Sequence, residues 1–331
     1  MPHTAIAALG TYVPERVVTN ADLTKLMETT DEWIQQRTGI KERHWVNPGQ
    51  GASDLALEAT KKALDKAGWK AQDIEAIVYA TLSPDHNFPG DGCFLGAKLG
   101  IPGVPALDIR NQCSGFIYGL SVADAWIKSG QYKKILLVGS EVHSTGLDVT
   151  TRGRDVAVIF GDGAGVALLE ATDDPKRGVL STHLHADGRF GKELWTEAPA
   201  SVAHPRLTNE MLAEGKHYPK MNGSTVFKHA VVRMPEVVGE ALKKNNLTPR
   251  DIKVLIPHQA NLRIAEMVQK SLELREDQVF NNIQKYGNTT AASIPICLAE
   301  AVEARGVKQG DVVALAAFGA GFTWASALIR W

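Results

Sequence analysis

The sequence predicts an α/β protein built from two related halves. Short apolar segments rich in Val, Ile and Ala alternate along the chain with amphipathic segments of helical period. This alternation is typical of a mainly parallel sheet covered by helices. A stretch that starts at Ala63 is also repeated, in weaker form, from Ala241. The alternation and the repeat together predict a duplicated fold.

The apolar segments have the length and the boundaries of buried strands. Each is short and ends near Gly, Pro or a charged residue. We expect strands at 74–82, 133–140, 156–171, 253–258 and 312–321. Amphipathic helices are expected between them, with the clearest patterns at 53–68, 114–130 and 231–245. The same order of helix and strand therefore recurs in both parts of the chain.

The internal repeat gives the boundary between the halves. ALDKAGWKAQDIEAIVYATLS and ALKKNNLTPRDIKVLIPHQAN both read as a helix end, a polar turn, Asp-Ile and an apolar strand. A second, shorter repeat matches Phe160-Gly161 and Gly163-Ala164-Gly165 with Phe318-Gly319-Ala320-Gly321. The polar stretch ATDDPKRG between the repeats has the Pro and Gly of a connection. We expect an N-terminal half at 1–174 and a C-terminal half at 175–331.

Composition excludes several classes of protein. The chain has 331 residues, of which 44% are apolar, so a sizeable core can be buried. A net charge of -1 argues against general nucleic-acid binding. No stretch approaches the roughly 20 apolar residues that span a bilayer, and the N-terminal segment does not resemble a secretory signal. Three distant cysteines do not make a disulfide scaffold. We expect a cytoplasmic protein with free thiols and no membrane insertion.

Cys113 is the cysteine with the sequence context of a nucleophile. It follows an extended segment and precedes the expected helix 114–130, whose first residues are small. The unpaired N–H groups of a helix N-terminus favour a thiolate and so lower the pKa of a thiol. Cys93 and Cys297 lie in apolar helical segments and read as small hydrophobic residues. On this local context, a buried structural role also stays open for Cys113.

A histidine and an asparagine complete a possible site. His258 ends the expected strand 253–258, at the sheet edge where α/β proteins carry catalytic groups. Asn288 follows a glycine and precedes a run of small residues. A hydrogen-bonded core histidine and a capping or turn asparagine are the structural alternatives. The order Cys, His, Asn also fits a papain-like protease, but Cys113 lacks the aromatic and Cys-rich surroundings of that signature.

The segment 191–220 has a different character from the rest of the chain. It is rich in Pro, His, Glu and Thr and shows little periodicity. A loop of this length in a compact domain is usually functional or mobile. A surface insertion without a role is an equal alternative.

The chain closely resembles the beta-ketoacyl-ACP synthase III family over nearly its whole length. The resemblance lies in GTYVPERVVTNADL, DEWIQQRTGIKERH, DIRNQCSGFIYGLSVADAWIKSG, IFGDGAG, STHLHADG, PHQANLRI, YGNTTAASIP and AFGAGFTWASALIRW. PHQANLRI together with YGNTTAASIP is highly specific, whereas GDGAG alone would be weak. The family implies the thiolase fold, with two similar halves in an αβαβα layering, and a homodimer.

The resemblance also implies roles for individual residues. Cys113 would be the acylated nucleophile, and His258 and Asn288 would drive malonyl decarboxylation. The backbone N–H groups of Cys113 and Ala320 would hold the oxyanion. Residues that match the CoA path are Thr29, Trp33, Arg37, Arg152, Asn261 and Arg263. Residues that match the carrier-protein surface are Gln259, Ala260, Asn261, Leu262, Arg263, Lys228 and Lys270. Phe88 matches a residue that reaches the acyl pocket of the partner subunit.

The implied reaction is a ping-pong condensation that initiates fatty-acid biosynthesis. An acyl-CoA loads Cys113, malonyl-ACP loses CO2, and the enolate attacks the acyl thioester. No metal or redox cofactor is implied, and no His/Cys cluster has the spacing of metal ligands. The alternatives are a polyketide or alkylquinolone starter enzyme, an acyltransferase with the same residues, and a silent carrier-binding module. The chain departs from the common family form at Asn111, Gln112 and Ala320 and in the length of 191–220. These departures lie near the acyl pocket and bear on the identity of the acyl primer more than on the reaction class.

Overall fold

The computed structural model describes residues 1–331 and contains two large sheets. The strands of the first sheet are β1 (His3–Tyr12), β4 (Ala76–Ala80), β5 (Ala106–Ile109), β6 (Lys134–Glu141) and β7 (Gly163–Thr172). The strands of the second sheet are β8 (Gly178–Ala186), β11 (Ile252–Pro257), β12 (Val312–Gly319) and β13 (Thr323–Arg330). The strand orders are β1-β7-β6-β4-β5 and β11-β12-β13-β8.

The two sheets have the same pairing pattern. In the first, β1 and β6 are antiparallel to β7, whereas β6, β4 and β5 are mutually parallel. In the second, β8 and β12 are antiparallel to β13, and β12 is parallel to β11. The equivalent of β5 is reduced to one parallel bridge between Leu255 and Val279. The predicted duplicated α/β fold is therefore confirmed.

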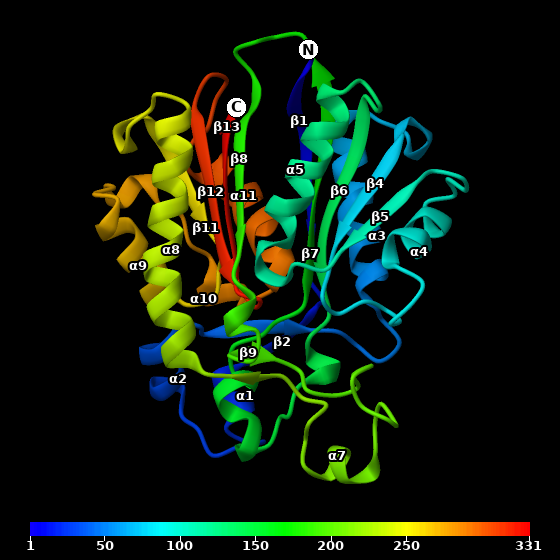
Figure 1. Cartoon of the computed structure of the whole chain (residues 1–331), viewed down its shortest axis with the longest axis vertical. Helices are drawn as coiled ribbons and strands as arrows, with labels where there is room; N and C mark the ends of the chain where they lie inside the picture. Colours follow the sequence, from blue (N-terminus) through cyan, green and yellow to red (C-terminus); the bar gives the residue numbers. More distant parts are fainter.

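The helices cover the sheets in an αβαβα arrangement (Figure 1). Helices α5 (Gly115–Lys128) and α11 (Ser293–Ala304) lie between the sheets and pack apolar side chains against both of them. The outer helices are α3 (Ala52–Ala67) and α4 (Asp91–Lys98) on the first sheet, and α8 (Gly223–Lys244) and α9 (Leu262–Ser271) on the second. The largest apolar cluster is therefore the one between the two halves.

A set of short elements gathers at one end of the sheets, in the lower part of Figure 1. It includes β2 (Arg16–Thr19), α1 (Asn20–Leu23), α2 (Asp31–Thr38), β3 (Glu42–Trp45), α6 (Arg154–Ala157), β9 (Leu194–Trp195), α7 (Asn209–Ala213), β10 (Lys220–Met221) and α10 (Ile283–Tyr286). A separate apolar cluster around Ile34, Trp45 and Val158 holds several of them together. This end of the molecule carries the site described below.

One capping turn, used twice, explains the internal repeat. A 3-10 turn precedes β4 and another precedes β11, at Ala71–Asp73 and Pro249–Asp251. The Asp73 carboxylate accepts from the Lys70 N–H at 2.8 Å, and the Asp251 carboxylate accepts from the Thr248 N–H at 2.7 Å. The isoleucine that follows each aspartate is 2% exposed. The repeated Asp-Ile pair therefore fixes the same helix-to-strand turn in both halves.

Four of the five expected strands are found within two residues of their predicted bounds. The strand expected at 156–171 is wrong in its first part, because β7 begins only at Gly163. Val156 and Phe160 pack into the apolar cluster around Trp45 instead of extending β7, and Arg154–Ala157 is helical. The helix expected at 231–245 begins earlier, at Gly223, where the side chain of Asn222 accepts from the Thr225 N–H.

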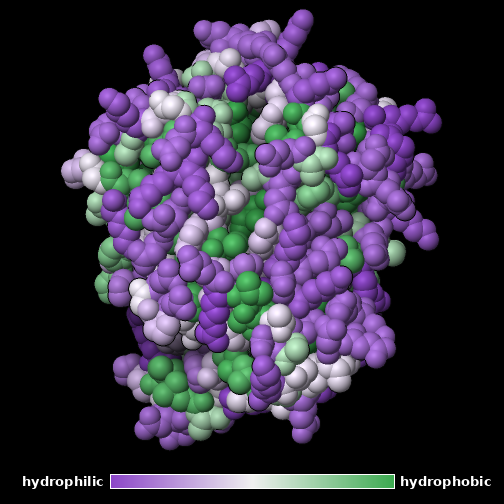
Figure 2. Space-filling model, turned by 180° about the vertical axis from the view of Figure 1, so that it is seen from behind, coloured by the Kyte–Doolittle hydropathy of each residue, from purple (hydrophilic) through white to green (hydrophobic).

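The surface agrees with a core that lies inside the layers. Seen from behind, the molecule is mostly hydrophilic, and hydrophobic surface gathers along the middle of this face and at its lower end (Figure 2). Cys93 is exposed, so its expected place in an apolar environment is wrong, whereas Cys297 is buried as expected. None of the helices combines the length and the hydropathy needed to span a bilayer.

Replacing Leu298 by alanine should lower the free energy of unfolding by about 2–5 kcal/mol. Leu298 is fully buried in the cluster between the two sheets, so the substitution leaves a cavity there. Leu26→Ala is the control, because Leu26 is 50% exposed and its loss should change stability by no more than about 0.5 kcal/mol. Guanidinium denaturation measures both. Equal effects would contradict the interior position of the central helices.

Candidate active site

Cys113 lies at the head of the central helix α5, in the 3-10 turn Gln112–Ser114 that follows β5. Gln112 has a φ of 43°, in the left-handed region that non-glycine residues rarely adopt. Gly319, the last residue of β12, lies against the cysteine, and a Cβ there would come within 2.5 Å of the Cys113 Cβ. The second half therefore closes over Cys113, which is 6% exposed.

The thiol of Cys113 is neutral in the free protein. Burial raises the pKa of Cys113 to about 12, and the charge of Glu141 adds to the rise. Hydrogen bonds from the backbone N–H groups of Cys113 and Ala320 lower the pKa but do not offset burial. The expected thiolate, stabilised by the helix N-terminus, is therefore wrong for the unliganded protein, because loss of hydration outweighs the helix end.

His258 directly follows β11 and is neutral as well. Its Nδ1 lies 2.6 Å from the Ser293 hydroxyl, and its Nε2 is buried without a hydrogen-bond partner. Burial lowers the pKa of His258 to about 3. An unpaired buried polar atom costs about 1–3 kcal/mol, so its presence calls for a functional explanation. Ser293 fixes the orientation of the ring and leaves Nε2 free for a ligand.

Asn288 joins the two halves through its backbone. Its N–H donates to the Ile159 carbonyl at 2.9 Å, and its carbonyl accepts from the Gly161 N–H at 3.1 Å. The side-chain Oδ1 accepts from the Thr290 N–H at 2.8 Å. Since the amide oxygen is engaged in this way, the side chain is left with its NH2 group as a donor.

Cys113 stands where two cavities meet. The first cavity has a volume of about 740 Å³ and is also lined by His258 and Asn288. The second has a volume of about 770 Å³. Cys113, Phe160 and Leu194 line both cavities. The structure therefore brings the three predicted residues into the lining of one cavity, which has the size that ligand sites usually have.

The outer part of the first cavity carries an aromatic ring beside positive charge. The guanidinium carbon of Arg37 lies 4.3 Å from the Trp33 ring centroid, and that of Arg154 lies 5.2 Å from it. The side chain of Asn261 donates to the Arg37 carbonyl at 2.8 Å. Lys228 and Arg263 line the same cavity. Such a surface suits a ligand that combines an aromatic base with phosphate.

Two residues expected on the CoA path lie outside the first cavity. Arg152 is paired with Asp148, with 2.5 Å between Nε and Oδ2. Arg154, which the sequence reasoning missed, takes the place beside Trp33. Thr29 also does not line this cavity, and its hydroxyl is buried without a partner. The arginine two residues along the chain from the expected one is therefore the one that faces the ligand space.

The residues expected at a carrier-protein surface divide into two groups. Lys228, Arg263 and Lys270 are exposed, while Ala260, Asn261 and Leu262 are partly buried. Gln259 is only 3% exposed. Its amide donates to the Pro257 carbonyl and accepts from the N–H groups of Asn282 and Ile283. A direct contact of Gln259 with a carrier protein does not fit this burial.

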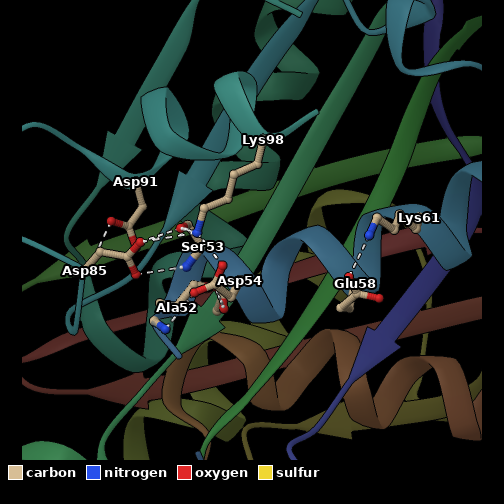
Figure 3. A network of polar contacts seen from close by, with 10 residues as sticks. Ala52, Ser53, Asp54, Glu58, Lys61, Asp85, Asp91 and Lys98 are labelled. Carbon is tan, nitrogen blue, oxygen red and sulfur yellow. Dashed lines mark hydrogen bonds and ion pairs between the residues drawn. The ribbon is translucent and has the colours of Figure 1, made fainter. Parts of the chain in front are cut away.

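The second cavity takes one wall from the segment 191–220, through Leu194, Trp195, His217 and Pro219. Another wall contains Asp85, which belongs to the polar network in Figure 3. Asp85 accepts from the N–H and the hydroxyl of Ser53, and Lys98 donates to the same hydroxyl at 2.6 Å. The segment 191–220 is therefore part of a cavity wall. Phe88 lines neither cavity and is 84% exposed.

Several residues of the site were missed from the sequence. Ser293 and Thr290 belong to the run of small residues after Asn288, and Phe160 belongs to IFGDGAG. Both motifs are recognisable in the sequence, but the contacts that these three residues make were not predicted. His143 lines the second cavity and carried no local signal. No group of three or more His, Cys, Asp or Glu side chains is placed to hold a metal ion.

A duplicated αβαβα fold with a cysteine at the head of its central helix is that of the thiolase-fold condensing enzymes. Residues 107–188 match the family described as 3-oxoacyl-[acyl-carrier-protein (ACP)] synthase III, and residues 242–331 match the family of its C-terminal part. The chain belongs to the beta-ketoacyl-[acyl-carrier-protein] synthase III family, as its motifs predict.

Individual relatives agree over nearly the full length. The chain is 44% identical over 326 residues to the beta-ketoacyl-[acyl-carrier-protein] synthase III of Caldanaerobacter subterraneus subsp. tengcongensis, covering 98% of this chain and 97% of that protein. The solved synthase III structures of Aquifex aeolicus and Thermus thermophilus each have a TM-score of 0.90, at 40% and 42% identity. Each match covers 99% of this chain, and they cover 100% and 99% of those chains.

Alkylation of Cys113 by iodoacetamide should accelerate about tenfold for each pH unit between about pH 7 and 10, without a plateau. Only the thiolate reacts, and the pKa of Cys113 is raised to about 12, so the thiolate fraction rises throughout this range. Mass spectrometry of peptides separates Cys113 from Cys93 and Cys297. A rate that levels off near neutral pH would show that the site stabilises the thiolate before substrate binds.

Proposed function

We propose that this chain transfers an acyl group from acyl-CoA to Cys113 and condenses it with malonyl-ACP, releasing CO2 and initiating fatty-acid synthesis. The observation that carries the proposal is the convergence of Cys113, His258 and Asn288 on one cavity, with His258 Nε2 buried and unpaired. The names of the full-length relatives support this activity over a starter enzyme of specialised metabolism.

The first half-reaction begins with a neutral thiol. The acyl-CoA carbonyl lies at Cys113, and His258 Nε2 takes the thiol proton as sulfur attacks the carbonyl carbon. The backbone N–H groups of Cys113 and Ala320, which already bond the sulfur, receive the oxyanion. The intermediate then expels the CoA thiolate, which takes the proton from His258 and leaves as the thiol. The Cys113 thioester remains.

The second half-reaction uses donors instead of a base. His258 Nε2–H and the Asn288 NH2 donate to the thioester oxygen of malonyl-ACP as CO2 departs and the enolate forms. The Ser293 hydroxyl can accept from or donate to Nδ1, so Nε2 can carry either a lone pair or a proton. The enolate carbon attacks the Cys113 thioester, the carbon–sulfur bond breaks, and the Cys113 thiolate that leaves takes up one proton from solvent. Only acyl-CoA and malonyl-ACP are required in this cycle.

The basic rim of the first cavity supports binding of CoA and of an acidic carrier. Trp33, Arg37 and Arg154 would stack on the adenine, and Lys228 and Arg263 would meet phosphate groups. Lys228, Arg263 and Lys270 are exposed and can also steer an acidic protein towards the mouth of the cavity. The phosphopantetheine arm of either substrate would then follow the same path to Cys113.

A homodimer would complete the second cavity. Strand β5 is at the edge of the first sheet, and its Leu107 is 39% exposed. Phe88, in the loop between β4 and α4, is 84% exposed. An open strand edge beside large exposed apolar side chains is usually covered by a partner. We place the dimer contact at β5, with Phe88 entering the second cavity of the partner subunit, as the family resemblance implies.

Asn288→Ala should lower CO2 release from malonyl-ACP by roughly 100- to 1,000-fold, because one donor to the developing oxyanion is lost. Acyl loading should stay within about threefold of wild type, since Asn288 takes no part in that step. Labelled acyl-CoA transfer and CO2 release measure the two steps separately. Asn245→Ala, which removes a hydrogen-bonded asparagine just after α8 that lines neither cavity, is the control. Collapse of both steps would contradict the separate roles.

Arg154→Ala should raise the KM for acyl-CoA by about tenfold, because a cation is lost beside the adenine site. Arg152→Ala should change KM much less, since Arg152 is paired with Asp148 outside the cavity. The comparison is repeated with acyl-pantetheine, which lacks the nucleotide and should remove the difference. A larger rise in the KM for acyl-CoA in Arg152→Ala than in Arg154→Ala would assign the contact with the adenine to Arg152.

Leu107→Arg should convert the proposed dimer into monomers. The substitution places a charge at the open edge of β5, where the partner strand would lie. Sedimentation velocity measures the change, and Leu26→Arg, at another exposed leucine, is the control. A Leu107→Arg variant that stays dimeric would place the interface elsewhere.

A further inference from the structure

The residue that orients Asn288 is itself held in an uncommon conformation. Thr290 has a φ of 48° and is fully buried. A β-branched residue in the left-handed region is rare, and it persists only where its surroundings enforce it. The conformation lets the Thr290 N–H reach back to Asn288 Oδ1 at 2.8 Å. The direction of the Asn288 NH2 group therefore depends on what holds Thr290.

His143 is the side chain that holds Thr290. Its Nε2 lies 2.7 Å from the Thr290 hydroxyl, across 147 residues of sequence and from the other half of the fold. Burial lowers the pKa of His143 to about 3, so the ring is neutral. A buried threonine hydroxyl left without this partner would be an unpaired polar group, and a turn back to a negative φ would then be the easier conformation.

The imidazole of His143 is held from two sides. Its backbone N–H donates to Asp162 Oδ1 at 2.7 Å. Its ring stacks obliquely on Phe160, with 4.6 Å between the ring centroids. Phe160 and Asp162 belong to the IFGDGAG motif, and Phe160 also forms the backbone bridge to Asn288. The ring of His143 is therefore fixed relative to the segment that carries Asn288.

We propose that His143 is a positioning residue for decarboxylation: by holding the Thr290 hydroxyl it fixes the left-handed turn that aims the Asn288 NH2 group into the first cavity. The inference rests on the proposed function of Asn288. Glu141 supports the same segment independently, because its carboxylate accepts from the Ala291 N–H at 3.3 Å. His143 is thus responsible for the direction of one side chain, and not for the position of the whole segment.

His143 also lines the second cavity, and an effect on the acyl group must be told apart from an effect on Asn288. His143→Leu fills similar space without a hydrogen bond, and His143→Gln keeps a polar atom near the position of Nε2. Ser144→Ala is the control, because it removes a hydroxyl bonded to Asp162 from the same loop without touching Thr290. Acyl loading of Cys113 and CO2 release from malonyl-ACP are measured on each variant.

His143→Leu should lower CO2 release about tenfold, corresponding to about 1.4 kcal/mol, while acyl loading stays within about twofold of wild type. His143→Gln should recover most of the loss, and Ser144→Ala should leave both steps unchanged. In an Asn288→Ala background, His143→Leu should cause no further loss, because the two residues act through one donor.

Three results would overturn the inference: unchanged CO2 release in His143→Leu, a loss confined to acyl loading, or an additional loss in the Asn288→Ala background. If His143→Leu does not fold, as judged by thermal melting, Thr290→Val tests the same hydrogen bond and should show the same tenfold fall, whereas Thr290→Ser should keep activity. If the wild-type protein itself releases no CO2 from malonyl-ACP, the proposed function fails instead.

Discussion

The close backbone approach of the two halves is the constraint on which the site depends. Gly139 of β6 lies against the Ala291 carbonyl, and Gly319 of β12 lies against Cys113. A side chain at either position would collide with the segment of the opposite half, so glycine is what permits the contact. Because of this approach, the segment 288–293 rests on the end of β6, where Glu141 accepts from Ala291. One short segment can then supply both Asn288 and the Ser293 hydroxyl that orients His258.

The same close packing keeps Cys113 and His258 uncharged in the resting site. Burial keeps the thiol of Cys113 protonated and the ring of His258 neutral, since it raises the first pKa and lowers the second. Glu141 is the carboxylate that raises the Cys113 pKa further, and its own pKa is raised by burial to about 7 despite hydrogen bonds from Ser83 and its neighbours. Charge therefore develops mainly when a thioester arrives, at atoms that already face backbone N–H groups or an unpaired imidazole nitrogen. Donors that need no rearrangement are most effective in such surroundings.

Local patterns were enough to predict the duplicated fold, the turn at Cys113 and the place of His258 at the end of a strand. The repeated Asp-Ile pair is readable because the aspartate caps a turn within three residues of sequence. The features that were missed depend on contacts formed in the folded chain, most of them between residues distant in sequence. The pKa of Cys113 depends on burial by the second half, and Arg154 replaces Arg152 because Asp148 captures the latter. The bond from His143 to Thr290 joins residues 147 positions apart, and no periodicity or motif in a single sequence marks such a pair.

The two sheets differ at one edge, and this difference bears on how the molecule assembles. In the first sheet β5 is a full edge strand, whereas its counterpart in the second sheet is a single bridge at Val279. The opposite edge strands of the two sheets, β1 and β8, lie beside each other within the subunit, where Gly178 packs against the backbone of Thr4. A duplicated protein that kept both outer edges could add copies at either end and grow into a fibre. In the homodimer proposed above, pairing through β5 would use this one edge, so two-fold symmetry would close the assembly at two subunits and the missing strand in the other half would limit polymerisation.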